Sequence, residues 1–428
     1  MKPVYGLLDI NNCFVSCERA FNPSLENVPV LVLSANDGCA IARSSEVKAL
    51  GIKMGDPHFK IARLCEDNAV RVLSSNFALY CGMSMRLMAE IQELVPAAEQ
   101  YSVDEVFIDL TGMPGDLGEY CRGIRKAIRR NLGLPNCVGT GPTKTLAKLA
   151  NQLAKKSKAA DSVVDLAGHP EWVEKALERT SVGDVWGIGA ASAAKLSKVG
   201  VLTALDLSRL DDRTVSRLLG VSGVRTAGEL RGVPFYEVET QPEPRQSCMV
   251  SRSFGNPTGD FEMIREAVIV HATAAAEKLR GESLVAGALT VFCETPRFRK
   301  DLLQKNVSAI ARLMPPTSDT LRIVKAAVSA LKAAWEPGPW LYGKAGVLMA
   351  DLCLASNVSG DLFMQPEKKP TPLMDAMDRL NSRFARGTVT LGTTSKTSSW
   401  RPRADNLSAD WISDWSQIPV AVAKPPQS

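Results

Sequence analysis

The sequence lacks the paired cysteines that commonly hold zinc ions or form redox-active dithiols. It contains 10 cysteines, but none of them forms a CxxC pair, and several are scattered through apolar stretches. This spacing argues against a zinc site and against a disulfide framework. We therefore predict reduced and mostly buried thiols.

Long apolar runs are missing as well. No window reaches the ~18 apolar residues of a membrane helix. Residues 1–9 contain one lysine and then a strand-like run, which is not the pattern of a signal peptide. We therefore expect a cytoplasmic protein with no membrane partner.

The composition is sufficient for several folded domains. The chain has 428 residues, of which 45% are hydrophobic and 23% charged, and chains of this length divide into domains of roughly 100 to 150 residues. The formal net charge is only +5. Residues 245–354 hold 14 Lys and Arg against 10 Asp and Glu, an excess of four positive charges. This segment is therefore a candidate phosphate-facing surface.

Strands and helices alternate through the first 165 residues. Short apolar runs predict strands, and apolar residues at helical spacing predict helices. The predicted strands are residues 4–10, 28–33, 101–110 and 138–140, and the predicted helices are residues 43–50, 74–95, 119–131 and 143–156. The strand at 101–110 carries an acidic pair in its middle.

The rest of the chain has a different character. Residues 181–231 contain short helices joined by glycine turns, and a proline-rich linker follows at 234–244. From residue 245 the pattern predicts strand, helix, strand, strand, helix and strand, the βαββαβ order. Beyond residue 355, polar and proline-rich stretches surround one helix at 372–384. We therefore expect a partly ordered tail.

Three carboxylates are placed where they could meet. Asp9 ends the first strand and Asp104 and Glu105 lie on another, and neighbouring strands are only ~5 Å apart. Grouped carboxylates repel one another unless hard cations lie between them, and oxygen-only ligands suit magnesium. The alternative is that Asp9 caps a turn while Asp104 and Glu105 form surface ion pairs. An acidic pair inside an apolar strand favours the metal site, because burying a carboxylate is costly.

A lysine stripe follows on the predicted helix at 143–156. Lys144, Lys148 and Lys155 have spacings of four and seven residues, so one helical face should present three ammonium groups. Ordinary solvation explains most such stripes, and a triphosphate contact is the functional alternative.

Three segments resemble the signature segments of Y-family translesion DNA polymerases, in the same order. They are DINNCFVSCE at residues 9–18, YSVDEVF at 101–107 and VGTGPTKTLAKLAN at 138–151. Similarity to the UmuC-like branch of that family extends through most of the chain and includes NDGCAIARSSEVKALGIKMGDP, DVWGIG and SRSFG.

This resemblance implies a right-hand polymerase with an α/β (α+β) multidomain fold. The expected parts are a palm at residues 1–25 and 74–165, small fingers at 26–73, a helix-hairpin-helix thumb at 166–235, a βαββαβ little finger at 245–353 and a tail at 354–428. The expected activity is error-prone, template-directed DNA synthesis past lesions in the bacterial SOS response. No segment of the sequence could be a proofreading exonuclease.

The resemblance also assigns roles to individual residues. Two Mg²⁺ ions would be held by the catalytic carboxylates Asp9, Asp104 and Glu105 together with the Ile10 carbonyl. The expected nucleotide-binding residues are Cys13, Phe14, Arg43, Ser45, Lys48 and Lys155. Among them, Phe14 matches the steric gate that excludes ribonucleotides, and a core phenylalanine is the alternative. Many relatives have tyrosine and arginine in place of Ser45 and Lys48, so a less bidentate phosphate contact is expected here.

Contacts to DNA and to proteins follow from the same resemblance. Gly187, Gly189, Gly220 and Gly223 resemble paired helix-hairpin-helix motifs, whose backbone N–H groups bind phosphate without reading sequence. The expected phosphate contacts of the little finger are Arg252, Arg297, Arg299 and Lys300. Leu362 and Phe363 lie where relatives carry a sliding-clamp peptide. The implied partners are primer-template DNA, deoxynucleoside triphosphates, a UmuD′-like dimer, RecA and the sliding clamp.

Two other functions remain open. A nucleotidyl cyclase also holds two metal ions on strand-borne carboxylates, but the hairpin motifs and the basic domain argue against it. A non-catalytic DNA-binding scaffold or regulatory subunit of a repair complex would have no need for the three carboxylates.

Overall fold

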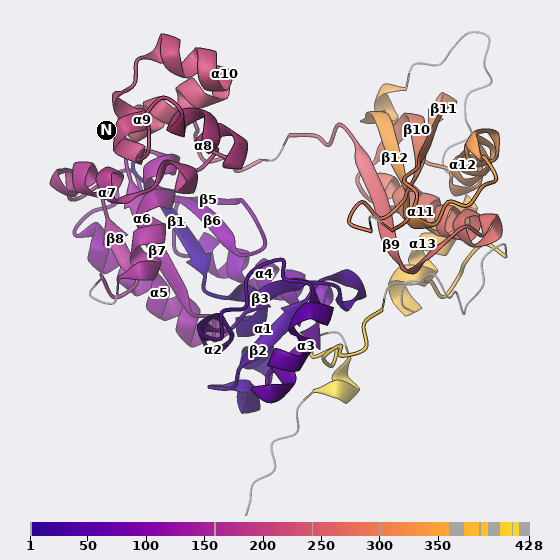
Figure 1. Ribbon diagram of the computed structural model, residues 1–428, viewed down its shortest axis with the longest axis horizontal. Coiled ribbons are helices and arrows are strands. Elements are labelled where there is room, and N and C mark those ends of the chain that lie inside the picture. The colour runs from indigo at the N-terminus through magenta and orange to yellow at the C-terminus, as the bar shows by residue number, and fades with distance from the viewer. Residues whose placement is uncertain are drawn as a thin grey trace, which may run out of the picture. The chain divides into compact units, whose positions relative to one another are not determined.

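The protein has two compact units, each with its own hydrophobic core. The structure is a computed structural model that describes residues 2–157, 160–241, 243–299, 301–358, 372–384, 387–392, 403–412 and 414–418. The first unit comprises residues 1–34, 38–242 and 406–428, and the second comprises residues 35–37 and 243–405 (Figure 1). The C-terminal segment of the first unit is thus separated in sequence from the rest of that unit by residues 243–405.

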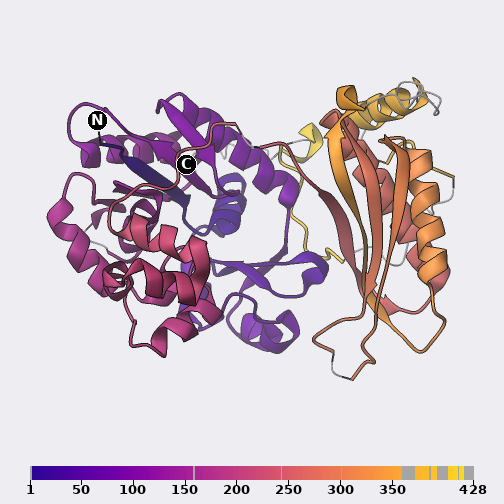
Figure 2. The ribbon, with the colours of Figure 1, turned by 90° about the horizontal axis from the view of Figure 1, so that it is seen from above.

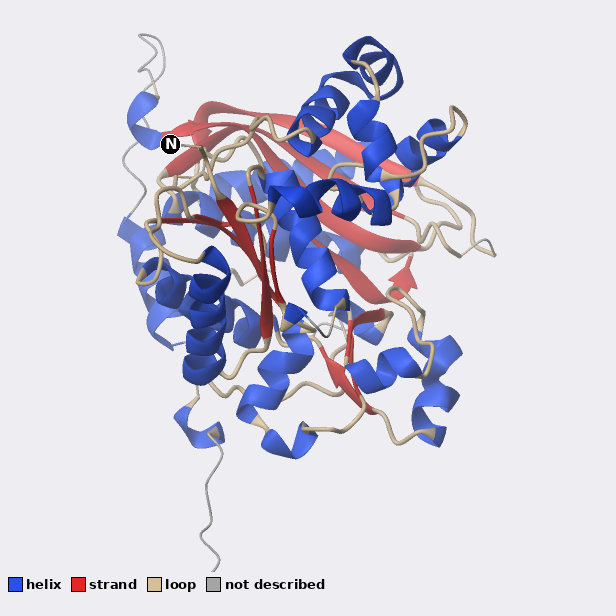
Figure 3. Ribbon diagram, turned by 90° about the vertical axis from the view of Figure 1, so that its left-hand side faces the viewer, coloured by secondary structure: helices blue, strands red, loops and turns tan. Residues whose placement is uncertain are grey.

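A five-stranded sheet is the framework of the first unit. Its order is β5-β6-β1-β7-β8, and β1 pairs antiparallel with both of its neighbours. The strands are β1 Tyr5–Ile10, β5 Ala97–Gln100, β6 Glu105–Asp109, β7 Asn136–Gly141 and β8 Val163–Asp165. All six residues of β1 are buried, because helices cover both faces of the sheet (Figure 3).

The two faces of the sheet are covered by different helices. Leu8 and Ile10 pack into a core shared with α1 (Cys13–Phe21), α4 (Phe77–Gln92) and α5 (Leu117–Leu132). Tyr5 and Leu7 point the other way and meet Ala147 on α6 (Lys144–Lys156). This alternation follows from the two-residue period of a strand. It also places Asp9 on the face that α6 covers.

A three-stranded sheet forms a smaller part of the first unit. Its order is β3-β2-β4, with β2 Val30–Leu33, β3 Ala40–Arg43 and β4 Arg71–Ser74, and the helices α2 Ser45–Ala49 and α3 His58–Asp67 belong to the same region. The helix predicted at 43–50 begins two residues late, because Arg43 pairs with Leu31 in the sheet and Ser44 caps the helix through the Val47 N–H. The helix predicted at 74–95 is likewise shortened at its start, since Ser74 belongs to β4 and Asn76 caps α4.

Further helices complete the first unit. They are α7 Val173–Arg179, α8 Ala190–Ser197, α9 Ala204–Arg209 and α10 Asp212–Leu230. Gly187 and Gly220 have φ values of 85° and 72°, and Gly220 kinks α10. The buried carboxylate of Glu229 accepts hydrogen bonds from the backbone N–H and hydroxyl of Thr145 at 2.9 and 2.8 Å. These bonds fasten α10 to the start of α6.

The second unit is a four-stranded antiparallel sheet with two long helices on one face (Figure 2). Its elements are β9 Cys248–Thr258, α11 Phe261–Gly281, β10 Leu284–Glu294, β11 Asn306–Thr317, α12 Thr320–Ala334 and β12 Tyr342–Leu354, and the strand order is β11-β10-β12-β9. The order along the chain is therefore βαββαβ. The helix α13 (Pro372–Phe384) is joined to α11 by a paired contact in which Arg280 donates to Asp378 at 2.7 and 2.8 Å.

The cysteine prediction is confirmed. All ten cysteines lie within the described residues and are unpaired, and seven are buried. Among the described ranges, no helix has both the length and the apolar character needed to cross a bilayer.

One buried histidine should make the second unit sensitive to acid. His271 on α11 is 3% exposed, and burial, with a smaller contribution from Arg252, lowers its pKa to about 4. Its unfolded pKa is about 6.5. The stability it contributes is therefore complete above pH 6.5 and is lost as the pH falls toward 4, because the unfolded chain binds the proton more readily.

We expect this residue to lower the free energy of unfolding by about 2 kcal/mol between pH 7.5 and pH 5. Urea denaturation of wild type and His271→Gln at both pH values measures it, since the variant cannot titrate in this range. An equal pH dependence in the two proteins would contradict the assignment.

Candidate active site

The three predicted carboxylates lie at one edge of the five-stranded sheet. Asp9 is directly opposite Glu105 in the pairing of β1 with β6, and the Ile10 N–H donates to the Asp104 carbonyl at 2.9 Å. The acidic pair does not lie in the middle of the strand as predicted, because β6 begins at Glu105 and Asp104 lies just before it. A turn precedes the strand, in which the Ser102 hydroxyl accepts from the N–H groups of Asp104 and Glu105 at 3.2 and 2.9 Å.

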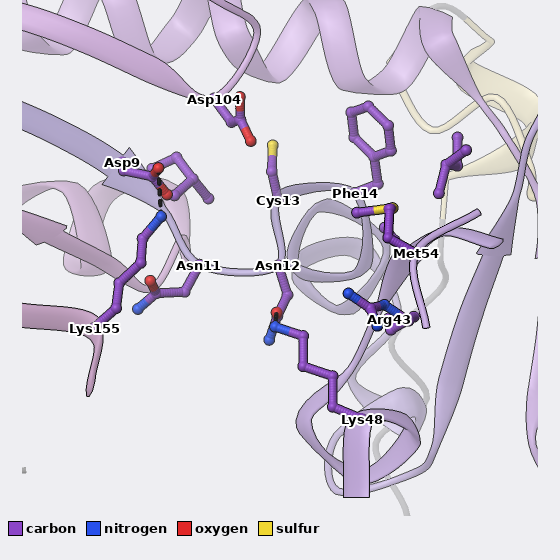
Figure 4. Close-up of a pocket in the computed structure, with 13 residues that line it drawn as sticks. Asp9, Asn11, Asn12, Cys13, Phe14, Arg43, Lys48, Met54, Asp104 and Lys155 are labelled. Atoms are coloured by element: carbon purple, nitrogen blue, oxygen red, sulfur yellow. Dashed lines mark hydrogen bonds and ion pairs between the residues drawn. The ribbon is translucent and has the colours of Figure 1, made fainter. Parts of the chain in front are cut away.

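A cavity of about 500 Å³ opens beside this edge. Its lining residues come from β1, α1, β3, α2, α6 and the connecting loops: Asp9, Ile10, Asn11, Asn12, Cys13, Phe14, Ile41, Ala42, Arg43, Lys48, Met54, Asp104 and Lys155. Figure 4 shows Asp9 and Lys155 on one side of the cavity and Phe14, Met54 and Arg43 on the other. Segments far apart in sequence thus converge on one space.

The structure brings two of the three carboxylates into the cavity. Asp9 and Asp104 line it, and Ile10 does as well. Glu105 is directed to α6, where its carboxylate accepts a hydrogen bond from Lys148 at 2.7 Å.

The three lysines of α6 each form an ion pair, and each pairs with a carboxylate on a different strand of the sheet. Lys144 pairs with Glu99 on β5, Lys148 with Glu105 on β6, and Lys155 with Asp9 on β1 at 2.5 Å. The stripe is therefore not a simple solvated face, and it does not present three ammonium groups to one ligand. Only Lys155 of the three lines the cavity.

Asp9 is in an environment that disfavours its negative charge. Burial raises the pKa of Asp9 to about 7, although Lys155 opposes this shift, and the negative charges of Glu105 and Asp104 add to it. The same contact raises the pKa of Lys155, despite the opposing effect of its burial. A buried carboxylate beside other acidic groups gains stability from an added cation.

The donor set fits a divalent cation by its chemistry. Two carboxylates at the cavity, a third on the adjacent strand and a backbone carbonyl provide only oxygen ligands, which magnesium prefers. Within the described ranges, no three acidic, histidine or cysteine side chains are already grouped around one point. The ion pairs of Asp9 and Glu105 with Lys155 and Lys148 account for this, because they turn the carboxylates toward α6.

Positive groups form another part of the cavity wall. Lys48 donates to the Asn12 side chain at 2.5 Å, and Arg43 donates to the Ile52 carbonyl at 2.8 Å. Burial and the nearby charges of Arg43 and Lys155 lower the pKa of Lys48. Within the described part of the chain, the Arg43 Nε atom is buried without a hydrogen-bond partner. This cationic wall suits an anionic ligand.

The ring of Phe14 completes the cavity wall, and the rings of Tyr80 and Phe77 pack against it; we call these three rings the aromatic wall. The ring of Phe14 stacks on Tyr80, with centroids 4.3 Å apart and planes at 9°, and it meets the edge of Phe77 at 5.8 Å. A hydrogen bond with Cys17 and burial raise the pKa of Cys13, which therefore remains a thiol. Of the six residues predicted to bind nucleotide, Cys13, Phe14, Arg43, Lys48 and Lys155 line the cavity, whereas Ser45 is exposed and does not.

Sequence reasoning missed several residues of the wall. They are Asn11, Asn12, Ile41, Ala42 and Met54. Asn12 has a φ of 50° at the start of α1, and asparagine is among the few residues that readily adopt this conformation. An Asn-Asn pair between a strand and a helix could therefore have indicated a tight turn beside the cavity. No comparable sequence pattern marks Met54 as a cavity residue.

Comparisons with known proteins place the chain in a family. The profile of the impB/mucB/samB family matches residues 8–152, and the profile of its C-terminal domain matches residues 245–362. The chain belongs to the impB/mucB/samB family. A domain of unknown function, DUF4113, matches residues 371–421.

Relatives of this impB/mucB/samB member match over nearly their full lengths. The protein UmuC from Salmonella typhimurium is 38% identical over 420 residues, which cover 97% of this chain and 99% of that protein. DNA polymerase IV from Bacillus velezensis is 24% identical over 416 residues, which cover 95% of this chain and 97% of that protein. Among solved structures, a Y-family DNA polymerase chimera of Dbh and Dpo4 has a TM-score of 0.64 at 18% identity, covering 82% of this chain and 99% of its own. The fold is therefore that of Y-family DNA polymerases.

Other predicted contact residues of this family member lie outside the cavity. Gly187 and Gly189 precede α8, and Gly220 and Gly223 lie at and after the kink of α10. In the second unit Arg252, Arg297 and Arg299 are exposed, although the latter two form ion pairs with Glu294 and Asp301. Lys300, Leu362 and Phe363 lie outside the described residues.

Proposed function

We propose that this member of the impB/mucB/samB family is a DNA-directed DNA polymerase that performs error-prone translesion synthesis in the bacterial SOS response. The observation that carries the proposal is the cavity at the sheet edge. One space is lined by two acidic groups, Asp9 and Asp104, and by three cationic groups, Arg43, Lys48 and Lys155. A nucleotidyl transferase needs both, because its metal ions require carboxylates and its triphosphate requires cations.

The acidic residues hold two Mg²⁺ ions in this proposal. Asp9, Asp104 and Glu105 supply carboxylates and Ile10 its carbonyl. When bound, such ions would supply activation of the primer 3′-hydroxyl and stabilisation of the charge on the leaving pyrophosphate. To hold a metal ion, Glu105 and Asp9 would have to give up their ion pairs with Lys148 and Lys155, and Lys155 could then contact the triphosphate.

The remaining wall selects and orients the nucleotide. Arg43 and Lys48, which both line the cavity, bind the triphosphate. The ring of Phe14 crowds the 2′ position of the sugar and so excludes ribonucleotides. Because the ring of Phe14 packs against Tyr80 and Phe77, these contacts hold it in place when a sugar with a 2′-hydroxyl enters.

The architecture divides into functional parts. We assign the palm to residues 1–25 and 74–165, the fingers to 26–73, the thumb to 166–235, the little finger to 245–353 and a tail to 354–428. The glycine turns at Gly187 and Gly220 bind DNA phosphates through backbone N–H groups, and Arg252, Arg297, Arg299 and Lys300 do so through side chains. The short fingers leave an open site that accepts damaged templates.

The proposed partners follow from the similarity to UmuC. They are a UmuD′-like dimer, RecA, and a sliding clamp that Leu362 and Phe363 contact, beside primer-template DNA and deoxynucleoside triphosphates. We propose that the protein acts in the cytoplasm.

Primer extension tests the function. The full chain is incubated with Mg²⁺, four deoxynucleoside triphosphates and a primer-template carrying one abasic site, with and without a UmuD′-like dimer and RecA filaments. We expect extension past the lesion that stops when EDTA removes the metal. A chain that binds primer-template but never extends it under any of these conditions would instead be a scaffold or regulatory subunit.

A further inference from the structure

A short C-terminal segment is bound to the first unit. We call residues 406–412 the strap. The Ser74 N–H donates to the Asn406 carbonyl at 2.9 Å, and the Asn406 N–H donates to the Ser74 hydroxyl at 3.0 Å. The Asn76 side chain donates to the Ser408 hydroxyl and the Ala409 carbonyl at 3.0 and 3.3 Å. The strap is therefore held at the end of β4 and the start of α4.

Apolar contacts extend this attachment across two helices. Trp411 stacks on Phe21 of α1, with centroids 6.5 Å apart and planes at 10°. Ile412 lies over Gly82 of α4, where an added Cβ atom would come within 2.2 Å of the Ile412 Cδ1 atom. Both strap residues pack against the core that contains α1 and α4. The strap thus spans the two helices that support the aromatic wall of the cavity.

A hydrogen-bond chain connects the strap to that wall. The Ser408 hydroxyl donates to the Glu18 Oε1 atom at 3.0 Å, and the Tyr80 hydroxyl donates to the same oxygen at 2.7 Å. Tyr80 is the ring on which Phe14 stacks. Phe14 and Glu18 are four residues apart on α1, so they lie on one face of the helix with Tyr80 against both.

The carboxylate in this chain depends on its two donors. Glu18 is 1% exposed, and burial raises its pKa while the hydrogen bonds from Tyr80 and Ser408 oppose that rise. A buried carboxylate that loses one donor is left partly unsatisfied, and its neighbours rearrange to compensate. Since Tyr80 is the other donor, the loss of Ser408 should change the position of the Tyr80 ring and hence of Phe14.

We propose that the strap positions Phe14 through Ser408, Glu18 and Tyr80, and thereby tightens the discrimination between deoxyribonucleotides and ribonucleotides. This inference rests on the proposed function of the cavity and extends it to a segment within the DUF4113 match. Ser408 is a positioning residue, because it acts through Glu18 and Tyr80 and does not contact the nucleotide.

The test compares insertion of ATP and dATP opposite a template thymine by the full chain. For Ser408→Ala we expect kcat/KM for ATP relative to dATP to rise about 3- to 10-fold, which corresponds to a loss of about 0.7–1.4 kcal/mol of discrimination in the transition state. Ser408→Thr keeps the hydroxyl and should restore the wild-type ratio. Ile412→Ala, which loosens the strap at another point, should raise the ratio as well.

A matched control lies on the strap itself. Leu407 is 55% exposed, so Leu407→Ala should keep the wild-type ratio and the wild-type Tm. Phe14→Ala sets the upper limit for the loss of discrimination. If the ratios of Ser408→Ala and Ile412→Ala stay within twofold of wild type while their Tm values fall, the strap is only structural and the proposal is overturned. It is also overturned if Phe14→Ala leaves the ratio unchanged.

Failure of the strap proposal can be distinguished from failure of the proposed polymerase function. If the polymerase function were wrong, the wild-type chain would not extend a primer at all. Titration calorimetry with dATP and with ATP, each in the presence of Mg²⁺, makes the same comparison without turnover. We expect Ser408→Ala to reduce the preference for dATP over ATP. An unchanged preference would overturn the role of the strap independently of catalysis.

Discussion

Replacing Asp104 with asparagine should abolish primer extension while leaving the fold intact. Asp104 lines the cavity, and its Oδ1 atom accepts a hydrogen bond from the Ser102 hydroxyl at 2.6 Å. Asparagine keeps that acceptor and removes only the charge that a metal ion needs. We expect the rate of nucleotide insertion to fall at least about 1,000-fold, equivalent to about 4 kcal/mol of transition-state stabilisation.

The measurement is single-nucleotide insertion at saturating dNTP and Mg²⁺, with circular dichroism to verify the fold. Asp109→Asn is a matched control, because it makes the same chemical change at the other end of β6. Its Oδ1 atom accepts from the Thr111 N–H at 2.8 Å, which asparagine preserves, so this variant should insert nucleotides at the wild-type rate. Activity of Asp104→Asn within tenfold of wild type would show that no essential metal ion is bound there.

Elements with a clear local pattern were predicted in the right order, whereas the helices α1 and α3 and the strands β3, β4, β5 and β8 were not predicted. The apolar run that ends at Asp9 forms β1, and the alternation after residue 245 gives the observed βαββαβ order. Boundaries were wrong where a cap or a sheet partner decided them. Arg43 belongs to β3 because it pairs with Leu31, and no local pattern marks that partner.

The cavity could be predicted only in part, because some of its contacts depend on how distant elements pack. Asp9 and Glu105 are opposite each other across two antiparallel strands, so they share the face that α6 covers. Their contacts with Lys155 and Lys148 follow from how α6 is placed on the sheet, and sequence spacing does not determine that placement.

The contacts of the strap are even harder to predict from the sequence. Ser408 and Ile412 lie more than 300 positions after the residues that they contact. Their segment is only seven residues long and mixes polar with apolar residues, so its pattern predicts no element. Its binding site depends on Gly82 and Asn76, which are positioned by the core of the first unit.

Replacing Gly139 with alanine should destabilise the first unit severely. An added Cβ atom on this residue of β7 would lie 2.0 Å from the Asn151 backbone nitrogen and 2.5 Å from the Ala147 carbonyl oxygen. Both atoms belong to the backbone of α6, so they cannot move aside as the tip of a side chain can. We expect a loss of about 4 kcal/mol or more in the free energy of unfolding, and a decrease in Tm of about 10 °C.

Thermal denaturation followed by circular dichroism measures this effect, and Gly123→Ala is its control. Gly123 lies in the exposed middle of α5, and an added Cβ atom there would meet nothing within 4 Å. Alanine should stabilise that helix by about 0.5–1 kcal/mol, because glycine loses more backbone entropy on folding. A Tm for Gly139→Ala within about 2 °C of wild type would show that α6 tolerates displacement from β7. The positions of Lys148 and Lys155 beside the carboxylates would then not depend on the close packing of this helix on the sheet.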